Sequence, residues 1–244
     1  MLAGQITTLT FFRYKTLFNK IWAFGMMQFA HPKLSKVEGQ TFYKLLGSGK
    51  VGFNPMPDWT VYALLQVWEN EEKAERFFAA SKLMDRYRKR SDEHWILYMK
   101  NKISRGRWAG NMPFSRHPET SESIPYVAAI TRATIKFKYL RKFWKSVPAS
   151  QSPLKDNPGL IYTKGIGEVP FLQMATFSLW KDQQSLDAFA YRSREHIRVI
   201  GDTRKLGWYR EELFSRFQPY RFEGSWNGVD IGALKVKSSD QSQR

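Results

Sequence analysis

The sequence predicts an α+β fold in which one βαββαβ unit occurs twice. Three observations lead to this prediction. Landmark residues recur in the same order in both halves of the chain, strand-like and helix-like patterns alternate within each half, and the composition is that of a packed protein. Of the 244 residues, 42% are hydrophobic and 16% aromatic, which is far more than a disordered chain contains.

The internal repeat is the most informative of these observations. Trp68, Phe77 and Ser81 are matched by Trp180, Phe189 and Ser193, and the members of each pair lie 112 residues apart. Further matches follow in order with small drift: residues 18–22 with 140–144, the Gly-x-Gly at 47–49 with that at 165–167, and the Gly-x-Trp at 106–108 with that at 224–226. An ordered series of this kind indicates two copies of one unit.

The elements of the first half follow from local patterns. Residues 5–14 have the Thr and Phe density of a strand, and residues 15–30 have apolar side chains at helical spacing. Residues 41–46 form a strand that ends in a glycine turn, and residues 60–68 alternate as a second strand. Asn70 caps a single helix over residues 70–90, with Glu71 and Glu72 in its first turn, and residues 94–102 form the last strand.

The second half repeats this order. We expect a strand over residues 126–137, a helix through residue 144, strands around residue 161 and over 172–180, a helix capped by Asp182, and a strand over 214–222. The order predicts ferredoxin-like halves at residues 1–110 and 126–232, with a Pro- and Ser-rich linker at 111–125 and a disordered tail at 233–244. Two such sheets close into one barrel of the dimeric α+β type, with a cavity between sheet and helices.

Charge and cysteine content limit the classes of function. Lys and Arg number 39 against 22 Asp and Glu, so the net charge is +17 and the pI is about 10.0. Anionic partners suit such a surface: nucleic acid, an acidic lipid surface, or an acidic protein or ligand. A basic surface with no functional partner is an equally common explanation. The basic residues lie in both halves without a nucleic-acid-binding motif, which disfavours nucleic acid. The absence of cysteine excludes Cys-ligated zinc, iron–sulfur clusters and thiolate-ligated haem.

No segment reaches the roughly 18 to 20 apolar residues of a membrane span. The longest apolar stretch, residues 21–30, is about half that length. We therefore expect a cytoplasmic protein that is soluble or peripherally attached to a membrane.

His196 is the strongest candidate ligand among the four histidines. Phe189, Ser193, His196 and Ile200 recur at the spacing of one helix face, so the imidazole shares the inward side of the helix that follows Asp182. The position 112 residues earlier is Met84. A buried, hydrogen-bonded structural histidine is the commoner explanation of such a pattern. The alternative is an axial ligand to haem iron, with Phe189 and Ser193 beside the cofactor.

Several segments together resemble the spheroidene monooxygenase family of carotenoid biosynthesis. They include Arg-Gly-Arg-Trp-Ala-Gly at 105–110, Thr-Arg-Ala-Thr-Ile at 131–135, Lys-Gly-Ile-Gly-Glu-Val-Pro at 164–170 and Gly-Trp-Tyr-Arg-Glu-Glu-Leu-Phe at 207–214. The resemblance covers about residues 5 to 230. It implies a haem-containing oxygenase that introduces a keto group into an acyclic carotenoid, using O2 and an external electron donor.

The resemblance and the residues agree on several points. Without cysteine, a haem b here needs a neutral ligand, most simply His196, so another group must polarise bound oxygen. Arg132 and Lys164 are the best basic candidates for that catalytic role or for binding a haem propionate, although a side chain that points to solvent is at least as common an explanation for each. The aromatic content suits a hydrophobic, carotenoid-like substrate.

Two alternatives stay open at the level of sequence. The first is a haem enzyme with another reaction, such as a dehydratase or a peroxidase-like activity. The second is a cofactor-free basic module that binds nucleic acid or membranes. A homodimer is a further expectation, by analogy with barrels of this type that pair.

Overall fold

The computed structural model describes residues 4–50, 54–121, 124–151, 154, 157–192 and 207–226. The first half contains β1 (Ile6–Arg13), α1 (Leu17–Phe29), α2 (His31–Leu34), β2 (Gln40–Lys50), β3 (Asn54–Trp68), α3 (Glu71–Ala80), α4 (Lys82–Arg90) and β4 (Glu93–Gly106). The second half contains β5 (Val127–Ile135), the 3₁₀ helix η1 (Phe137–Tyr139), α5 (Leu140–Gln151), β6 (Leu160–Val169), β7 (Gln173–Trp180), α6 (Gln183–Arg192) and β8 (Tyr209–Gly224).

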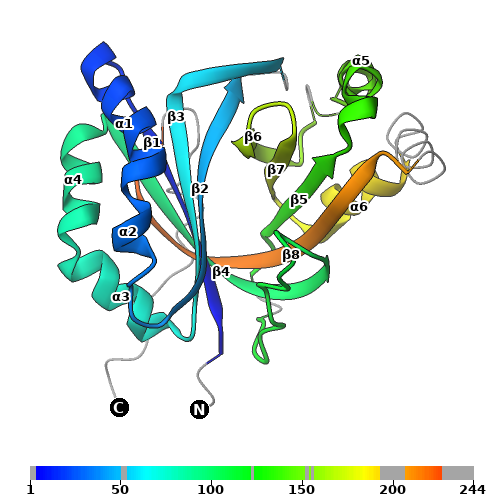
Figure 1. The fold of residues 1–244 in the computed structure, drawn as a ribbon. Coiled ribbons are helices and arrows are strands. Elements are labelled where there is room, and N and C mark those ends of the chain that lie inside the picture. The colour runs from blue at the N-terminus through cyan, green and yellow to red at the C-terminus, as the bar shows by residue number, and fades with distance from the viewer. Residues whose placement is uncertain are drawn as a thin grey trace.

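The eight strands form one closed antiparallel barrel in the order β1-β3-β2-β6-β7-β5-β8-β4, as Figure 1 shows. Strands of the first half are neighbours in the order β4-β1-β3-β2, and those of the second half in the order β8-β5-β7-β6. The β4–β8 seam runs from the pair Trp95 and Gly224 to the pair Gly106 and Leu213. The other seam is short, with pairs at Gly47–Gly167 and Ser48–Ile166. The predicted α+β barrel is therefore observed.

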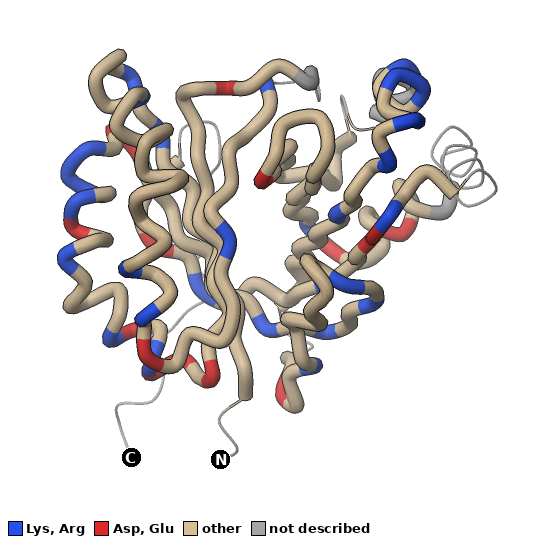
Figure 2. The backbone as a smooth tube through the Cα atoms, viewed as in Figure 1, with Lys and Arg blue, Asp and Glu red and all other residues tan. Residues whose placement is uncertain are grey.

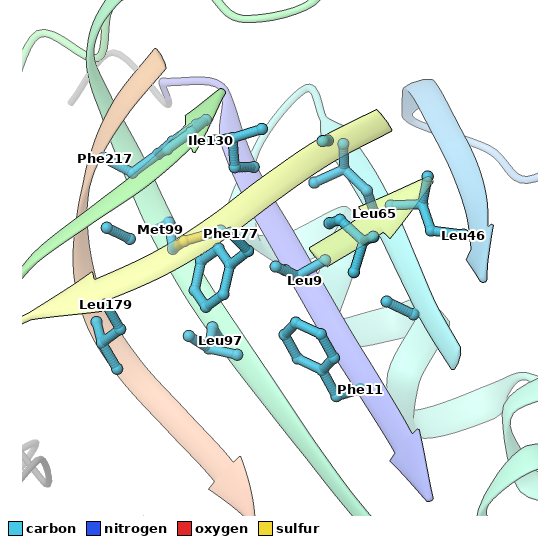
Figure 3. Packing of buried hydrophobic residues seen from close by; sticks show 14 of the residues in the cluster. Leu9, Phe11, Leu46, Leu65, Leu97, Met99, Ile130, Phe177, Leu179 and Phe217 are labelled. Atoms are coloured by element: carbon cyan, nitrogen blue, oxygen red, sulfur yellow. The ribbon is translucent and has the colours of Figure 1, made fainter. Parts of the chain in front are cut away.

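Inward-facing side chains fill the barrel with apolar groups. The alternation of each strand directs Leu9 and Phe11 of β1 and Phe177 and Leu179 of β7 into this core, where Figure 3 shows them packed with residues of β3, β4, β5 and β8. The ring of Phe11 lies 5.6 Å from that of Phe177, although the two strands belong to different halves. The interior is thus one continuous core shared by both halves.

A second core lies between the outer face of the first-half sheet and helices α1 to α4, which cover that face in Figure 1. Trp68 is fully buried there and packs on Phe77 of α3 with ring centroids 5.2 Å apart. The second half contains the matching contact, because Trp180 lies 5.3 Å from Phe189 of α6. The first residues of α3 and α6 also lie 112 residues apart.

The single helix predicted over residues 70–90 is wrong. It is two helices that meet at Ser81, whose extended backbone (φ −77°, ψ 110°) ends α3. The Ser81 hydroxyl then accepts a hydrogen bond from the Met84 amide and caps α4. Apolar periodicity continues across the break, so the pattern alone did not reveal it.

The predicted glycine turn after residue 46 is also wrong, because Gly47 and Gly49 lie within β2. A Cβ on Gly167 would lie 2.5 Å from the carbonyl oxygen of Gln173 in β7, so this glycine permits the close β6–β7 approach within the second half, whereas a Cβ on Gly47 would lie 3.9 Å from the Gly167 carbonyl oxygen across the short seam, an ordinary contact. The tail predicted at residues 233–244 lies outside the described residues.

Glycines also close the long seam. Gly106 and Gly224 both have positive φ, and a Cβ there would lie 2.1 Å from the Glu212 carbonyl oxygen and 2.2 Å from the His94 carbonyl oxygen, respectively. Each of these two glycines therefore permits backbone contact with the opposite strand, and the two lie near opposite ends of the seam.

We expect Gly106→Ala to lower the free energy of unfolding by roughly 2 to 5 kcal/mol, because the methyl group adds a backbone clash to an unfavourable φ. Gly110→Ala is the matched control, since Gly110 also has positive φ but a methyl group there would meet no atom within 4 Å beyond its chain neighbours. Gly110→Ala should lower the free energy of unfolding by about 1 to 2 kcal/mol. Urea denaturation measures both, and equal losses would show that the close approach contributes nothing.

Candidate functional site

An ionic cluster lies at one end of the barrel interior. Arg132 follows Ala128 and Ile130 on the inward face of β5 and is only 2% exposed. Its guanidinium donates a hydrogen bond to Glu211 of β8 and lies 3.6 Å from a carboxylate oxygen of Glu168 in β6. A buried guanidinium needs such partners, because an unpaired charge in this position is costly.

Glu168 links this arginine to the first half of the chain. Its Oε1 accepts from Lys44 Nζ at 2.5 Å, and its Oε2 accepts from Trp108 Nε1 at 2.7 Å. Lys164, 8% exposed, donates to Asp58 Oδ2 at 2.7 Å. Both basic residues singled out from the sequence therefore point into the barrel rather than to bulk solvent, and each is paired with a carboxylate.

The surroundings of Asp58 and Glu211 favour the ionised form of each carboxylate. Burial acts to raise the pKa of Asp58, but hydrogen bonds from Lys164 and Thr60 outweigh it and lower the pKa. Burial likewise acts to raise the pKa of Glu211, and the amides of Gly110 and Ala109 together with Arg132 lower it. The cluster thus holds charge-balanced pairs at neutral pH.

The cluster joins segments that are distant in the chain. Arg132, Lys164, Trp108 and Glu211 each belong to one of the strings on which the family resemblance rests. The sequence analysis selected Arg132 and Lys164 but missed the acceptors Asp58, Glu168 and Glu211. Glu168 and Glu211 stand inside the quoted strings, which was the available signal, whereas nothing marked Asp58.

Phe189 lies on the other side of the second-half sheet. It packs with Trp180, Leu186, Val127 and Ala129 in a cluster on the outer face. Because Val127 and Ala129 alternate with Ala128 and Ile130 along β5, the sheet separates this cluster from Arg132. The structure therefore does not bring Phe189 together with Arg132 and Lys164.

The outer faces of the two sheets differ in side-chain size. The pair Ile6–Trp68 in the first half corresponds to the pair Val127–Trp180 in the second, which aligns β1 with β5. In this alignment Thr10 corresponds to Thr131, and Phe12 corresponds to Ala133. In the same alignment, the first half has Leu64 in β3 where the second has Thr176 in β7, and Leu45 in β2 where the second has Gly165 in β6. Thr10 and Phe12 are buried, whereas Thr131 is exposed although β5 is paired on both sides. Small side chains thus leave the middle of the second outer face less covered.

Ser193 and His196 lie outside the described residues, so both stay predictions. The other three histidines have local partners in or near the first half. His31 Nδ1 lies 3.0 Å from the Tyr43 hydroxyl, the His94 ring stacks on Phe12, and His117 Nδ1 accepts from the Glu119 amide. Within the described ranges, no group of three or more His, Asp or Glu side chains is arranged to hold a metal ion.

Comparison with solved structures confirms the class of fold. An aldoxime dehydratase in complex with butyraldoxime has a TM-score of 0.61 and covers 91% of this chain and 83% of its own. A second aldoxime dehydratase structure has a TM-score of 0.62, with 89% and 82% covered. Both are 9% identical to the chain, so this likeness concerns the fold alone. The fold and the cluster define an α+β barrel protein with a buried ionic centre at one barrel end.

Sequence comparison is more specific. The chain is 36% identical over 240 residues to spheroidene monooxygenase of Cereibacter sphaeroides, covering 97% of this chain and 74% of that protein. It is 34% identical to the Rhodobacter capsulatus protein of the same name, with 95% and 97% covered, and 33% identical to that of Rubrivivax gelatinosus, with 87% and 82% covered. No protein-family model matches. The chain belongs to the spheroidene monooxygenase family.

We expect the hydrogen bonds that Glu211 accepts from the Gly110 and Ala109 amides, together with its pairing with Arg132, to contribute stability that is lost in acid. Because the folded-state pKa of Glu211 lies below its unfolded value, the stabilisation is present above the unfolded pKa and is lost as the pH falls through the folded pKa. Glu211→Gln should lower the free energy of unfolding by roughly 1 to 3 kcal/mol at neutral pH and flatten its acid dependence.

Glu212→Gln is the control for this experiment, since its exposed side chain is adjacent in sequence but directed away from the cluster. Urea unfolding at a series of pH values gives the free energy of unfolding at neutral pH and its change in acid. An acid dependence unchanged in Glu211→Gln would contradict the assignment.

Proposed function

We propose that this protein is a monooxygenase, an oxidoreductase that inserts oxygen into a carotenoid such as spheroidene. The observation that carries the proposal is the 33–36% identity to three spheroidene monooxygenases over most of each chain. The convergence of the family-like strings on one ionic cluster supports a functional role for that cluster, because it gathers Trp108, Arg132, Lys164, Glu168 and Glu211 from distant segments.

We also propose that the enzyme uses a haem, bound against the outer face of the second-half sheet. The described residues fit the wall of such a site: Phe189 is partly exposed above the buried Trp180, and Ala133, Thr176 and Gly165 stand where the first half has Phe12, Leu64 and Leu45. When bound, a haem would supply the centre at which O2 is activated, with electrons from an external donor.

The repeat supports His196 as the residue that would hold the haem iron. Its counterpart Met84 is fully buried in α4, in the core cluster that also contains Phe12 and Leu64 of the first-half sheet. Where the first half has Phe12 and Leu64, the second half has the smaller Ala133 and Thr176. Ser193 is the counterpart of Ser81 in the sequence repeat.

Arg132 and Lys164 stay the proposed catalytic basic residues, but they point into the barrel, so a haem on the outer face of the sheet would not touch them and their proposed role is toward the substrate. Since each is ion-paired, a substrate group that uses its charge must compete with Glu211 or Asp58 for it. A pocket of about 230 Å³ lined by Asp58, Glu168 and Met174 gives a ligand access to the carboxylate side of these pairs.

We interpret the barrel as two ferredoxin-like repeats. The strand orders β4-β1-β3-β2 and β8-β5-β7-β6, the repeated Trp–Phe contacts and the two seam glycines support this interpretation. One copy then serves mainly as a filled, stabilising half, and the other presents the more open sheet face.

Turnover of spheroidene tests the proposed reaction. With reductant and isotopically labelled O2, we expect a keto carotenoid that carries the label by mass spectrometry, and Arg132→Met should lower kcat at least about tenfold. Met112→Ser, at an exposed site, is the control. Oxidation without label, measured at short times to limit exchange with water, would exclude a monooxygenase.

Absorption spectroscopy tests the cofactor. We expect protein purified with haem to show a Soret band that His196→Ala loses and His31→Ala retains, because His31 is exposed and bonded to Tyr43. Protein that stays colourless and takes up no added hemin would overturn the haem proposal. A Soret band that survives in His196→Ala would overturn the assignment of the ligand.

A further inference from the structure

Helix α1 is apolar on two opposite faces. Ala23 and Met26 are buried against the sheet, as the inner face of a surface helix should be. Leu17, Ile21 and Phe24, spaced four and three residues apart, form an outer stripe and are 73%, 62% and 55% exposed. The helix itself contains one charged residue, Lys20. A contiguous exposed stripe of this kind marks an interaction surface.

The same stripe continues onto the first-half hairpin. Trp59 of β3 is half exposed and its ring lies 5.0 Å from that of Phe24, while Met56 lies three residues before it and is also exposed. Figure 1 shows the beginning of α1 and the beginning of β3 at the same edge of the molecule. The apolar surface therefore includes both a helix and a strand end.

Helix α4 places basic side chains beside this stripe. It contains Lys82, Arg86, Arg88, Lys89 and Arg90 against a single acidic residue, Asp85. The Arg90 guanidinium lies over the rings of Phe18 and Trp22 of α1, at 5.2 and 5.0 Å, so the two helices form one surface. Figure 2 shows the Lys and Arg positions along α4 next to the nearly uncharged α1.

We propose that this surface, formed by the α1 stripe, Trp59 and the basic residues of α4, docks on an anionic lipid membrane. Apolar side chains flanked by Lys and Arg combine burial at the acyl boundary with attraction to acidic headgroups. A second copy of the chain fits less well, since it would bring another +17 protein against the basic helix. No described helix has the length and apolarity to cross a bilayer.

The docking surface adjoins the ionic cluster. Phe24 and Trp59 also line the pocket of about 230 Å³ that contains Asp58 and Glu168. This part of the inference rests on the proposed function: a hydrocarbon dissolved in the bilayer would leave it beside α1 and enter this pocket. Lipid binding itself does not depend on the reaction.

Vesicle co-sedimentation of the full chain tests the docking surface. We expect binding to vesicles of phosphatidylglycerol and phosphatidylcholine, and at least about tenfold weaker binding to phosphatidylcholine alone. Leu17→Ser/Ile21→Ser and Arg86→Glu/Lys89→Glu should each lower the partition coefficient at least about tenfold. Met112→Ser and Lys181→Glu, exposed substitutions elsewhere, should stay within about twofold of wild type.

Unchanged binding by Leu17→Ser/Ile21→Ser would overturn the proposal, as would equal binding to both kinds of vesicle. A wild-type dimer that this variant converts to a monomer would assign the stripe to a second copy instead. Circular dichroism confirms that each variant is folded.

Turnover separates this inference from the proposed function. With spheroidene in detergent micelles, Leu17→Ser/Ile21→Ser should work as wild type, and with spheroidene in vesicles it should be slower. Normal lipid binding without turnover would overturn only the proposal that the protein is a monooxygenase. Turnover without lipid binding would overturn only the proposal that the surface docks on a membrane.

Discussion

The close approach of two backbones along the β4–β8 seam is the constraint on which the rest of the structure depends. Two four-stranded sheets become one barrel only if strands from different halves pair along their length, and Gly106 and Gly224 permit this near the two ends of the seam. The shorter β2–β6 seam pairs Gly47 with Gly167 and Ser48 with Ile166. Once both seams are closed, the inward faces share a single apolar core, and the fold is no longer two separable sheets.

A sealed apolar core determines where charge can lie within the barrel. Arg132 and Lys164 point inward, so each needs a carboxylate within reach: Arg132 pairs with Glu211 of its own half, and Lys164 pairs with Asp58 of the other half. The partners come from β8 for Arg132 and from β3 for Lys164, and Glu168 connects the arginine to Lys44 of β2. The ionic cluster therefore also ties the halves together, because an acid–base pair that spans a seam is complete only in the closed barrel.

Sequence patterns predicted local features well and long-range partners poorly. Strand alternation and helix spacing act within a few residues, and they located most elements to within a few positions, including β1, β7 and the start of α3. The break at Ser81 was missed because apolar periodicity continues through it. Asp58 and Glu211 were missed because they lie 106 and 79 residues from their basic partners, and no local pattern encodes such a pairing. The repeat helped most, since it predicted that Trp180 and Phe189 correspond to Trp68 and Phe77.

The differences between the two halves say more about function than their similarity does. If the halves are the two repeats proposed above, each has an outer sheet face, and stability requires at least one of these faces to be well filled. The first half buries Phe12 and Leu64 under its helices, so it can stabilise the barrel while the second carries Ala133 and Thr176 at the matching positions. In the first half, Ala23 and Met26 bury one side of α1, which leaves the opposite side of that helix available to carry exposed apolar residues. The proposed cofactor wall on the second half and the proposed lipid-facing helix on the first are thus compatible, because they use different faces of different halves.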